Sequence, residues 1–573
     1  MMSSNATSKD QLSSSDAARQ LIELLADEGV THLFMNPGTD TAPIQEALAA
    51  ARAARAPHPQ SVLCVHEHVA LSSAIAHHMV TGRPQAVMVH VDAGTLNLGG
   101  SLHNAQRNRI PVVVFAGRAP YTVRTDIPGH RDATIHWPQE QLDQPAVMRA
   151  YGKWSMEVPR GRELGTIVRR AFQVAQTSPQ GMAYVMLPRE ALMDPAGPSP
   201  CQLRPPSPPA PDPTALAELA ERLAGAERPV IVTARTGAHP ENVATLVRLA
   251  DLLGAPVIDQ RDRLNFPSDH PLYAGTHEEL LRRADVILLL DVEVPWIPAF
   301  VSPPAEATIL QIDIDPVKPS MPTWAFPIDL AVMADTRLAL PALEHVLEGL
   351  VTPEQRRRWE ARRERVTAEL AEVRDGWRRR ASSDRPEDAA DVALAALARS
   401  LPREAVVLEE AVTNRSALVR QIGREPGRYF SSSAPSLGWA VGGALGARLA
   451  KPEAPVIAVC GDGSFQFAVP NAALWSARRA GAPFVAVVLN NGSYRASRLP
   501  VMNLYPEGAA AHHNDFPETE LQPSLDHTLL ARACGGDGAV VESPADLGEA
   551  LAWALETVDC GGCAVLDVRL PTT

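Results

Sequence analysis

Cysteine is scarce in this sequence, with six residues scattered over 573 positions. So few cysteines do not form a disulfide framework, and we therefore expect a cytoplasmic protein. The CGGC stretch at 560–563 has the spacing of a metal or redox site. No second pair or nearby histidine completes a zinc site, and the two glycines are typical of a turn that enters a strand.

The sequence also lacks an excess of basic residues and any long apolar run. Its formal net charge is −13, and in its densest basic segment, 355–380, arginines alternate with acids. This pattern is typical of a solvated helix face, so we expect no nucleic acid partner. No apolar run reaches the roughly 18 residues of a membrane span, so we expect no membrane partner. The polar residues 1–14 predict a disordered tail, not a signal peptide.

Proline, by contrast, is plentiful and indicates the domain organisation. Residues 194–213 are so rich in proline that they can form neither a helix nor a central strand. This Pro-rich linker and a helical linker at 346–388 separate three blocks, 15–193, 214–345 and 389–573. In each block, β-branched runs such as PVVVFAG, VILLLD and PVIAVC alternate with amphipathic stretches. We therefore predict an α/β protein with three doubly wound parallel-sheet domains.

The third block contains two polar turns, GDG at 461–463 and NN at 490–491. Each turn follows an apolar run that predicts a buried strand, and the residues between them supply a crossover helix and the return strand. Because parallel strands end at the same sheet edge, we expect the two turns to lie side by side. Glycines allow a phosphate to approach the backbone, and carboxylate and amide oxygens suit Mg²⁺. The alternative is that both are ordinary strand-ending turns.

Together, at this spacing, the two turns resemble the signature of thiamine diphosphate (ThDP) enzymes. The resemblance is to the group of acetolactate synthase, pyruvate oxidase and benzoylformate decarboxylase, and it is closest in style to acetolactate synthase large-subunit-like proteins. It covers nearly the whole chain, from about Ser15 onward. It implies a pyrimidine-binding, a middle and a diphosphate-binding domain in that order, with ThDP and Mg²⁺ as cofactors.

The resemblance also implies roles for residues of the third block. Asp462, Asn491 and the carbonyl group of Ser493 would bind Mg²⁺. Pro435 stands where the family more usually has a glycine. The cofactor-binding residues that the resemblance implies are Thr413, Leu437, Gly438, Gly463, Ser464 and Tyr494.

In the first block, Glu67 follows a predicted strand and opens a helix whose apolar stripe would bury it. A buried carboxylate needs a partner and is a candidate for proton transfer, although an acid can also simply complement a helix dipole. The resemblance implies that Glu67 binds the aminopyrimidine ring of ThDP. It further implies a proton-relaying role for His90 at the substrate carboxylate, and positions near the substrate for Thr39 and Gln139.

The implied reaction begins with decarboxylation of a 2-oxo acid, which leaves an enamine. Ligation of the enamine to a second carbonyl would make the protein an acetolactate synthase-like carboligase, which Gln139, Glu140 and the ILQIDIDP stretch favour. Protonation to an aldehyde, as in benzoylformate decarboxylase, is the alternative. Against it, Glu293 and Trp296 occupy the loop where those enzymes have a second catalytic histidine. A non-catalytic ThDP-binding subunit is a minor alternative, since it would be expected to lose Glu67 or the metal ligands.

Two further expectations concern cofactors and assembly. The sequence shows no convincing glycine-rich loop that would contact a flavin, so FAD is doubtful. The resemblance implies a homodimer or homotetramer in which Glu67 reaches ThDP across a subunit interface.

Overall fold

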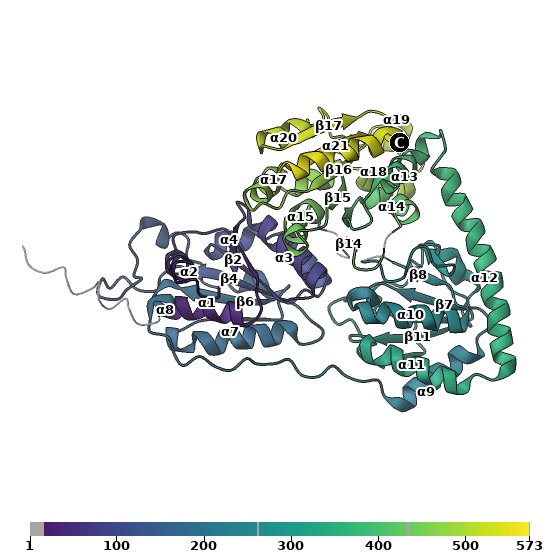
Figure 1. Cartoon of the computed structure of the whole chain (residues 1–573), viewed down its shortest axis with the longest axis horizontal. Helices are drawn as coiled ribbons and strands as arrows, with labels where there is room; N and C mark the ends of the chain where they lie inside the picture. Colours follow the sequence, from purple (N-terminus) through teal and green to yellow (C-terminus); the bar gives the residue numbers. More distant parts are fainter. Residues whose placement is uncertain (1–15, 261–262, 424, 433–435, 572–573) are drawn as a thin grey trace, which may run out of the picture. The chain divides into compact units, whose positions relative to one another are not determined.

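The computed structural model describes residues 16–260, 263–423, 425–432 and 436–571. The predicted tail at 1–14 and Pro435 lie outside the described residues. Three parallel sheets of six strands each organise the chain, with helices between the strands, and Figure 1 labels strands of all three. The prediction of three parallel-sheet domains is therefore confirmed. The exact domain boundaries stay a prediction.

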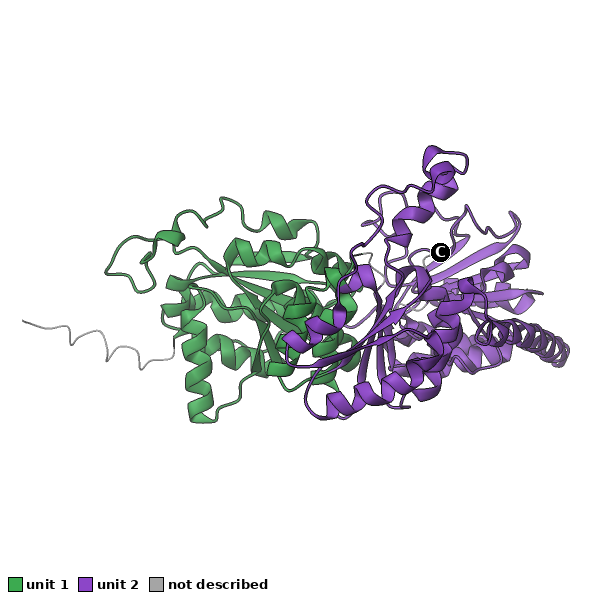
Figure 2. Ribbon diagram, turned by 90° about the horizontal axis from the view of Figure 1, so that it is seen from above, with its two compact units in different colours: residues 1–206, 433–452, 466–483 green, residues 207–432, 453–465, 484–573 purple. Residues whose placement is uncertain are grey.

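The described chain divides into two compact units (Figure 2). The first comprises 1–206, 433–452 and 466–483, and the second comprises 207–432, 453–465 and 484–573. The second and third sheets belong to the second unit, whereas two helices that lie between strands of the third sheet in the sequence belong to the first.

The first sheet has the strand order β2-β1-β3-β4-β6-β5. Because β1 lies between β2 and β3, the order reverses there, and ligands of open α/β sheets bind at the carboxyl ends of strands near such a point. The strands are β1 (His32–Met35), β2 (Gln60–Leu63), β3 (Gln85–Val89), β4 (Val112–Arg118), β5 (Trp154–Glu157) and β6 (Ala183–Pro188). The helices are α1 (Ala17–Asp27), α2 (Ala42–Ala54), α3 (Glu67–Thr81), α4 (Val91–Asn97), α5 (Gly100–Arg107), α6 (Ala146–Arg149), α7 (Gly161–Gln176) and α8 (Arg189–Met193).

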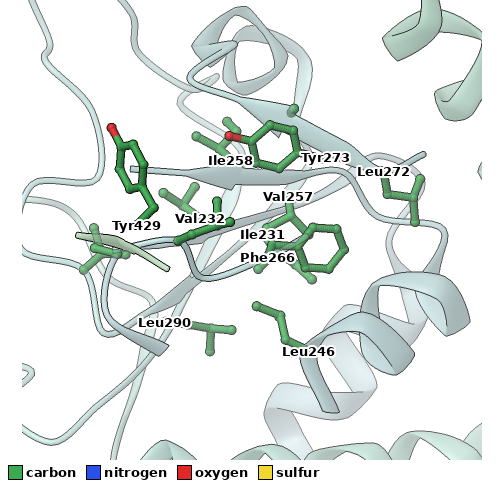
Figure 3. Close-up of a cluster of buried hydrophobic side chains, with 14 of the residues drawn as sticks. Ile231, Val232, Leu246, Val257, Ile258, Phe266, Leu272, Tyr273, Leu290 and Tyr429 are labelled. Atoms are coloured by element: carbon green, nitrogen blue, oxygen red, sulfur yellow. The ribbon is translucent and has the colours of Figure 1, made fainter. Parts of the chain in front are cut away.

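The second sheet has the order β12-β11-β10-β7-β8-β9. Its central strands are buried along their whole length, as expected for a parallel sheet covered on both faces. Figure 3 shows part of this core, with Ile231 and Val232 of β7 near Phe266 and Leu290. The strands are β7 (Pro229–Thr233), β8 (Val257–Asp259), β9 (Tyr273–Gly275), β10 (Val286–Leu290), β11 (Thr308–Asp313) and β12 (Leu330–Met333). The helices are α9 (Pro213–Gly225), α10 (Pro240–Leu253), α11 (Thr336–Leu350) and α12 (Pro353–Arg380).

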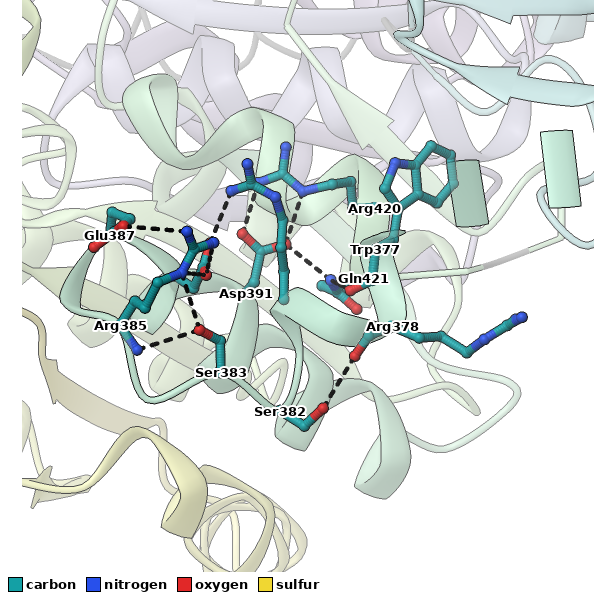
Figure 4. Close-up of polar contacts among 11 residues, drawn as sticks. Trp377, Arg378, Ser382, Ser383, Arg385, Glu387, Asp391, Arg420 and Gln421 are labelled. Atoms are coloured by element: carbon teal, nitrogen blue, oxygen red, sulfur yellow. Dashed lines mark hydrogen bonds and ion pairs between the residues drawn. The ribbon is translucent and has the colours of Figure 1, made fainter. Parts of the chain in front are cut away.

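The charged segment before the third sheet forms the 28-residue helix α12, and the helix α13 (Ala389–Ser400) follows it. Buried Asp391 of α13 accepts hydrogen bonds from Arg420, at 2.7 and 2.6 Å, and from Gln421 at 2.8 Å (Figure 4). These bonds fix α13 to α14 at the start of the third block. No helix among the described residues is long and apolar enough to cross a membrane.

The third sheet has the order β14-β13-β15-β16-β18-β17. The crossover from β15 to β16 holds two helices, α16 and α17, where the sequence predicts one. Val469 between them has a φ of 50°, and Pro470 begins α17 without an N–H group to continue the first helix. The strands are β13 (Val406–Glu410), β14 (Tyr429–Ser431), β15 (Val456–Gly461), β16 (Val485–Asn490), β17 (Asp537–Val541) and β18 (Ala564–Arg569). The helices are α13 (Ala389–Ser400), α14 (Arg415–Gln421), α15 (Trp439–Ala450), α16 (Asp462–Phe467), α17 (Pro470–Arg479), α18 (Arg495–Leu504), α19 (Ala509–His513), α20 (His527–Ala533) and α21 (Leu547–Asp559).

Candidate active site

Asp462 lies directly after β15, at the carboxyl edge of the third sheet. Its side chain is buried, and its two carboxylate oxygens accept hydrogen bonds from the backbone N–H groups of Gly463 at 2.9 Å and Gly492 at 2.8 Å. Burial raises the pKa of Asp462, because a charged carboxylate is costly away from water. A cation at this carboxylate would offset that cost.

The two asparagines of the NN turn have different surroundings. Asn490 ends β16 and donates from its side-chain amide to Asp567 at 2.9 Å. Asn491 follows it, and its side-chain oxygen accepts from the backbone N–H of Ser493 at 3.0 Å. The predicted ligands Asp462, Asn491 and Ser493 therefore follow neighbouring strands at one sheet edge.

The chemistry of this edge fits a magnesium diphosphate. A carboxylate oxygen, an amide oxygen and a backbone carbonyl are the hard oxygen donors that Mg²⁺ prefers. A Cβ atom at Gly463 would lie 2.7 Å from the Tyr494 ring, so glycine is what allows this close approach. Ser464 lies buried in the first turn of α16, and Thr413 follows β13, the neighbour of β15. These residues would hold the diphosphate at the strand ends.

A buried network next to the predicted Mg²⁺ ligands was not predicted from the sequence. Asp567 of β18 accepts from Asn490 and from the His527 imidazole at 3.0 Å, and it forms an ion pair with Arg569 at 3.1 Å. Asn490 in turn accepts from the backbone N–H of Gly492 at 3.0 Å. Asp567 thereby orients Asn490, which in turn holds the backbone of the NN turn. An acid inside the apolar run AVLDVR is the sequence signal that could have found it.

In the first unit, Glu67 is the first residue of α3 and is buried. Its two carboxylate oxygens accept hydrogen bonds from the side-chain amides of Asn36 at 3.0 Å and Asn97 at 3.1 Å. A Cβ atom at Gly94 would lie 3.0 Å from one of these oxygens. The two side-chain amides are the partners that this buried acid requires, and they hold the Glu67 carboxylate in one orientation.

Leu437 and Gly438 form a turn before α15, in the same unit as Glu67. Gly438 has a φ of 98°, and a Cβ atom there would lie 2.5 Å from the carbonyl oxygen of Phe467, so this position requires glycine. The Gly438 carbonyl oxygen lies 3.2 Å from Nε2 of buried His68. Leu437 is half-buried in this fixed turn, as a residue that supports a cofactor would be.

Three predicted substrate residues also lie in the first unit. His90 follows β3, and its Nδ1 atom contacts the carboxylate of Asp40, a residue that sequence reasoning did not single out. Gln139 lies beside this imidazole, and its buried side-chain amide helps to raise the pKa of His90. Thr39 is exposed, and its backbone carbonyl accepts from Arg189 at 3.4 Å. Thr39 and His90 follow β1 and β3, which are neighbours at the reversal of strand order.

The middle-domain loop that contains Glu293 and Trp296 is held by contacts of its own. Glu293 pairs with Arg235 at 2.8 Å, and its carbonyl accepts from the Trp324 indole at 2.5 Å. Trp296 is buried edge-on against Phe326, with ring centroids 5.3 Å apart. These contacts account for both residues by packing within the second unit.

Family models of thiamine pyrophosphate enzymes match three parts of the chain. The N-terminal TPP binding domain matches residues 15–147, the central domain 216–343 and the C-terminal TPP binding domain 411–568. A benzoylformate decarboxylase of Pseudomonas aeruginosa is 31% identical over 554 residues, which are 93% of this chain and 95% of that protein. The chain therefore belongs to the thiamine pyrophosphate enzymes, and its binding domains indicate ThDP as the cofactor.

Other relatives show how broad this family is. An acetolactate synthase of Bacillus subtilis is 25% identical over 588 residues, 96% of this chain and 92% of that protein. A solved ThDP-dependent 4-hydroxybenzoylformate decarboxylase of Rhodococcus jostii shares the fold, with a TM-score of 0.77, 23% identity and coverage of 98% of this chain and 100% of that one. The relatives thus include both decarboxylases and carboligases.

Proposed function

We propose that this protein is a ThDP- and Mg²⁺-dependent enzyme that decarboxylates a 2-oxo acid and releases an aldehyde. The observation that carries the proposal is the His90 imidazole held against the buried carboxylate of Asp40. Asp40 raises the pKa of His90, so that the ring stays protonated at higher pH than an ordinary histidine. A protonated imidazole at the strand ends attracts a substrate carboxylate and can supply the proton that an aldehyde product requires. The benzoylformate decarboxylase relative also supports this choice.

The remaining site residues serve binding and proton transfer. Asp462, Asn491 and the Ser493 carbonyl would hold Mg²⁺, and Gly463 and Ser464 would receive the diphosphate. When bound, ThDP supplies the electron sink for the electrons that loss of CO₂ leaves behind. Asn36 and Asn97 hold the Glu67 carboxylate in one orientation, in which an oxygen of Glu67 would hold or release a proton at the aminopyrimidine ring of bound ThDP.

A carboligase of the acetolactate synthase type is the second candidate. It is favoured by Gln139, whose buried side-chain amide lies beside His90 and could bind the carbonyl oxygen of an acceptor. Glu140, the other residue of the pair, contacts Arg131 instead. The acetolactate synthase relative supports this candidate.

Product analysis distinguishes the two candidates. Purified protein with ThDP and Mg²⁺ is incubated with pyruvate, a longer 2-oxo acid and benzoylformate, and CO₂ and organic products are identified. The decarboxylase predicts CO₂ with an equal amount of aldehyde. Acetolactate or another 2-hydroxy ketone as the main product would favour the carboligase, and no CO₂ from any 2-oxo acid would contradict both.

A further inference from the structure

Asp40 and His90 form an ion pair at the carboxyl edge of the first sheet. Asp40 lies in the turn between β1 and α2, and His90 follows β3, the neighbour of β1. The contact joins Oδ1 of Asp40 and Nδ1 of His90. Two residues 50 positions apart thus meet because their strands are adjacent.

Two glycines leave the space that this pair occupies. A Cβ atom at Gly117, in β4, would lie 1.4 Å from Oδ2 of Asp40, so no larger residue can stand there while the carboxylate keeps its position. A Cβ atom at Gly38 would lie 2.1 Å from Nδ1 of His90. The backbone is therefore shaped on two sides to receive the carboxylate and the imidazole.

The two side chains of this pair differ in their exposure to solvent. The side chain of Asp40 is 1% exposed, whereas that of His90 is 26% exposed. Because Nδ1 is engaged by Asp40, Nε2 is the ring nitrogen that a ligand can reach. A purely local role for His90 is not supported, since it is the N-cap residue of α4 but its side chain makes no capping hydrogen bond.

We propose that Asp40 is a positioning residue that holds the His90 imidazole in one orientation and as an imidazolium, with Nε2–H directed at the carboxylate of a 2-oxo acid. This inference rests on the proposed function. It adds Asp40 to the site as the residue that keeps His90 charged. An Asp partner on Nδ1 fixes which nitrogen faces the ligand and stabilises the cation, much as carboxylates do for other functional histidines.

The charged and polar groups that face His90 come from three segments. Asp40 raises the pKa of His90 most, Gln139 and Asp92 of α4 add to this effect, and burial opposes it. Removal of the Asp40 charge should therefore lower the pKa of His90 more than removal of the Asp92 charge does.

The test is the ionisation of His90 measured without catalysis. In holoenzyme with ThDP and Mg²⁺, diethyl pyrocarbonate modifies only neutral imidazole, and peptide mass spectrometry gives the rate at His90 as a function of pH. In Asp40→Asn, the rate at about pH 6 should rise, by up to roughly tenfold for each unit by which the pKa falls while it stays above that pH. Exposed His512 serves as the internal reference whose rate should not change.

Two further variants guard against a folding defect. Gly117→Ala keeps the Asp40 carboxylate but displaces it, so it should lower the pKa of His90 as Asp40→Asn does. Asp92→Asn removes a buried charge that does not contact the ring, and should have a smaller effect. An unchanged rate profile at His90 in both Asp40→Asn and Gly117→Ala would overturn the proposal.

The catalytic consequence has its own readout. The wild-type kcat/KM for a 2-oxo acid should fall as pH rises through the raised pKa of His90. In Asp40→Asn this fall should begin at lower pH. A lower pKa at His90 without movement of the pH profile would also overturn the proposal. If instead the wild type decarboxylates no 2-oxo acid, the proposed function fails, and the modification rates still decide whether Asp40 controls His90.

Discussion

The carboxylate of Asp462 accepts a hydrogen bond from the backbone N–H of Gly492 at 2.8 Å, across 30 positions of the sequence. The bond joins the GDG turn to the NN turn, which follow the adjacent strands β15 and β16. The two turns are therefore one structure within the fold, and the carboxylate is oriented before any ion binds. Such preorganisation reduces the cost of assembling a metal site.

Because Gly463 lies close to Tyr494, we expect a single added methyl group at position 463 to weaken ThDP binding. In Gly463→Ala, the new Cβ would lie 2.7 Å from the tyrosine ring and displace it. We expect ThDP binding in the presence of Mg²⁺, followed by fluorescence quenching, to weaken by at least about tenfold. Gly461→Ala is the matched control, because a Cβ there meets no heavy atom within 4 Å. Equal affinities of the two variants would show that the approach does not matter.

The Asp567 network predicts that a residue remote from the ligands controls metal affinity. Asp567→Asn places an N–H₂ group against the donors of Asn490 or His527, so Asn490 should rotate and release Gly492. Residues that orient metal ligands are commonly worth about 10- to 100-fold in affinity. We expect a loss of this size in Mg²⁺ titrations of ThDP binding. Asp537→Asn, which changes a half-exposed aspartate of β17 that pairs with Arg532, should cause no loss. Unaltered Mg²⁺ affinity in Asp567→Asn would refute this role.

His77 of α3 predicts how stability depends on pH. Burial, with a smaller effect from His32, lowers the pKa of His77 from 6.5 to about 3. Below pH 6.5 the unfolded chain gains a proton here that the folded chain does not. The free energy of unfolding should therefore fall as pH drops from 6.5 toward 3, by up to about 1.4 kcal/mol per unit.

Urea unfolding of His77→Phe across this pH range should show a shallower slope than the wild type. His512→Phe, which replaces an exposed histidine, should leave the slope as it is. If His77→Phe and the wild type share one slope, His77 is not neutral in the fold.

Subunit assembly can be tested by complementation. We expect a dimer as the smallest active unit, with Glu67 reaching ThDP that is bound by the partner subunit. Glu67→Gln and Asp462→Ala are each expected to be inactive, but mixed subunits would contain one intact site. Co-expression with differently tagged chains should restore part of the activity. A fully active monomer in sedimentation measurements, or no restoration in verified heterodimers, would contradict the expectation.

The sequence predicts the strands that are long and β-branched, and the structure contains them. VILLLD and PVIAVC correspond to β10 and β15. Strands β8 and β9 were not predicted, because three residues each are too few to show a periodicity. The break between α16 and α17 also was not predicted, although Pro470 marks it.

For the candidate site, polar residues at strand ends could be predicted, but their partners could not. Glu67 and His90 stand out in the sequence by their position after apolar runs. Their partners Asn36 and Asp40 do not, because each pairing depends on which strands become neighbours in the sheet. The order β2-β1-β3 follows from the packing of the whole domain and not from any local spacing.

We expect Glu67 to serve proton transfer at ThDP without taking part in Mg²⁺ binding, and Glu67→Gln separates these two roles. The measurement compares CO₂ release from 2-oxo acids with ThDP and Mg²⁺ binding in the same preparation, with exposed Glu46→Gln as the control. We expect turnover to fall by about 10²- to 10⁴-fold, with Mg²⁺-dependent ThDP binding largely retained. Turnover at the wild-type rate in Glu67→Gln would contradict this expectation.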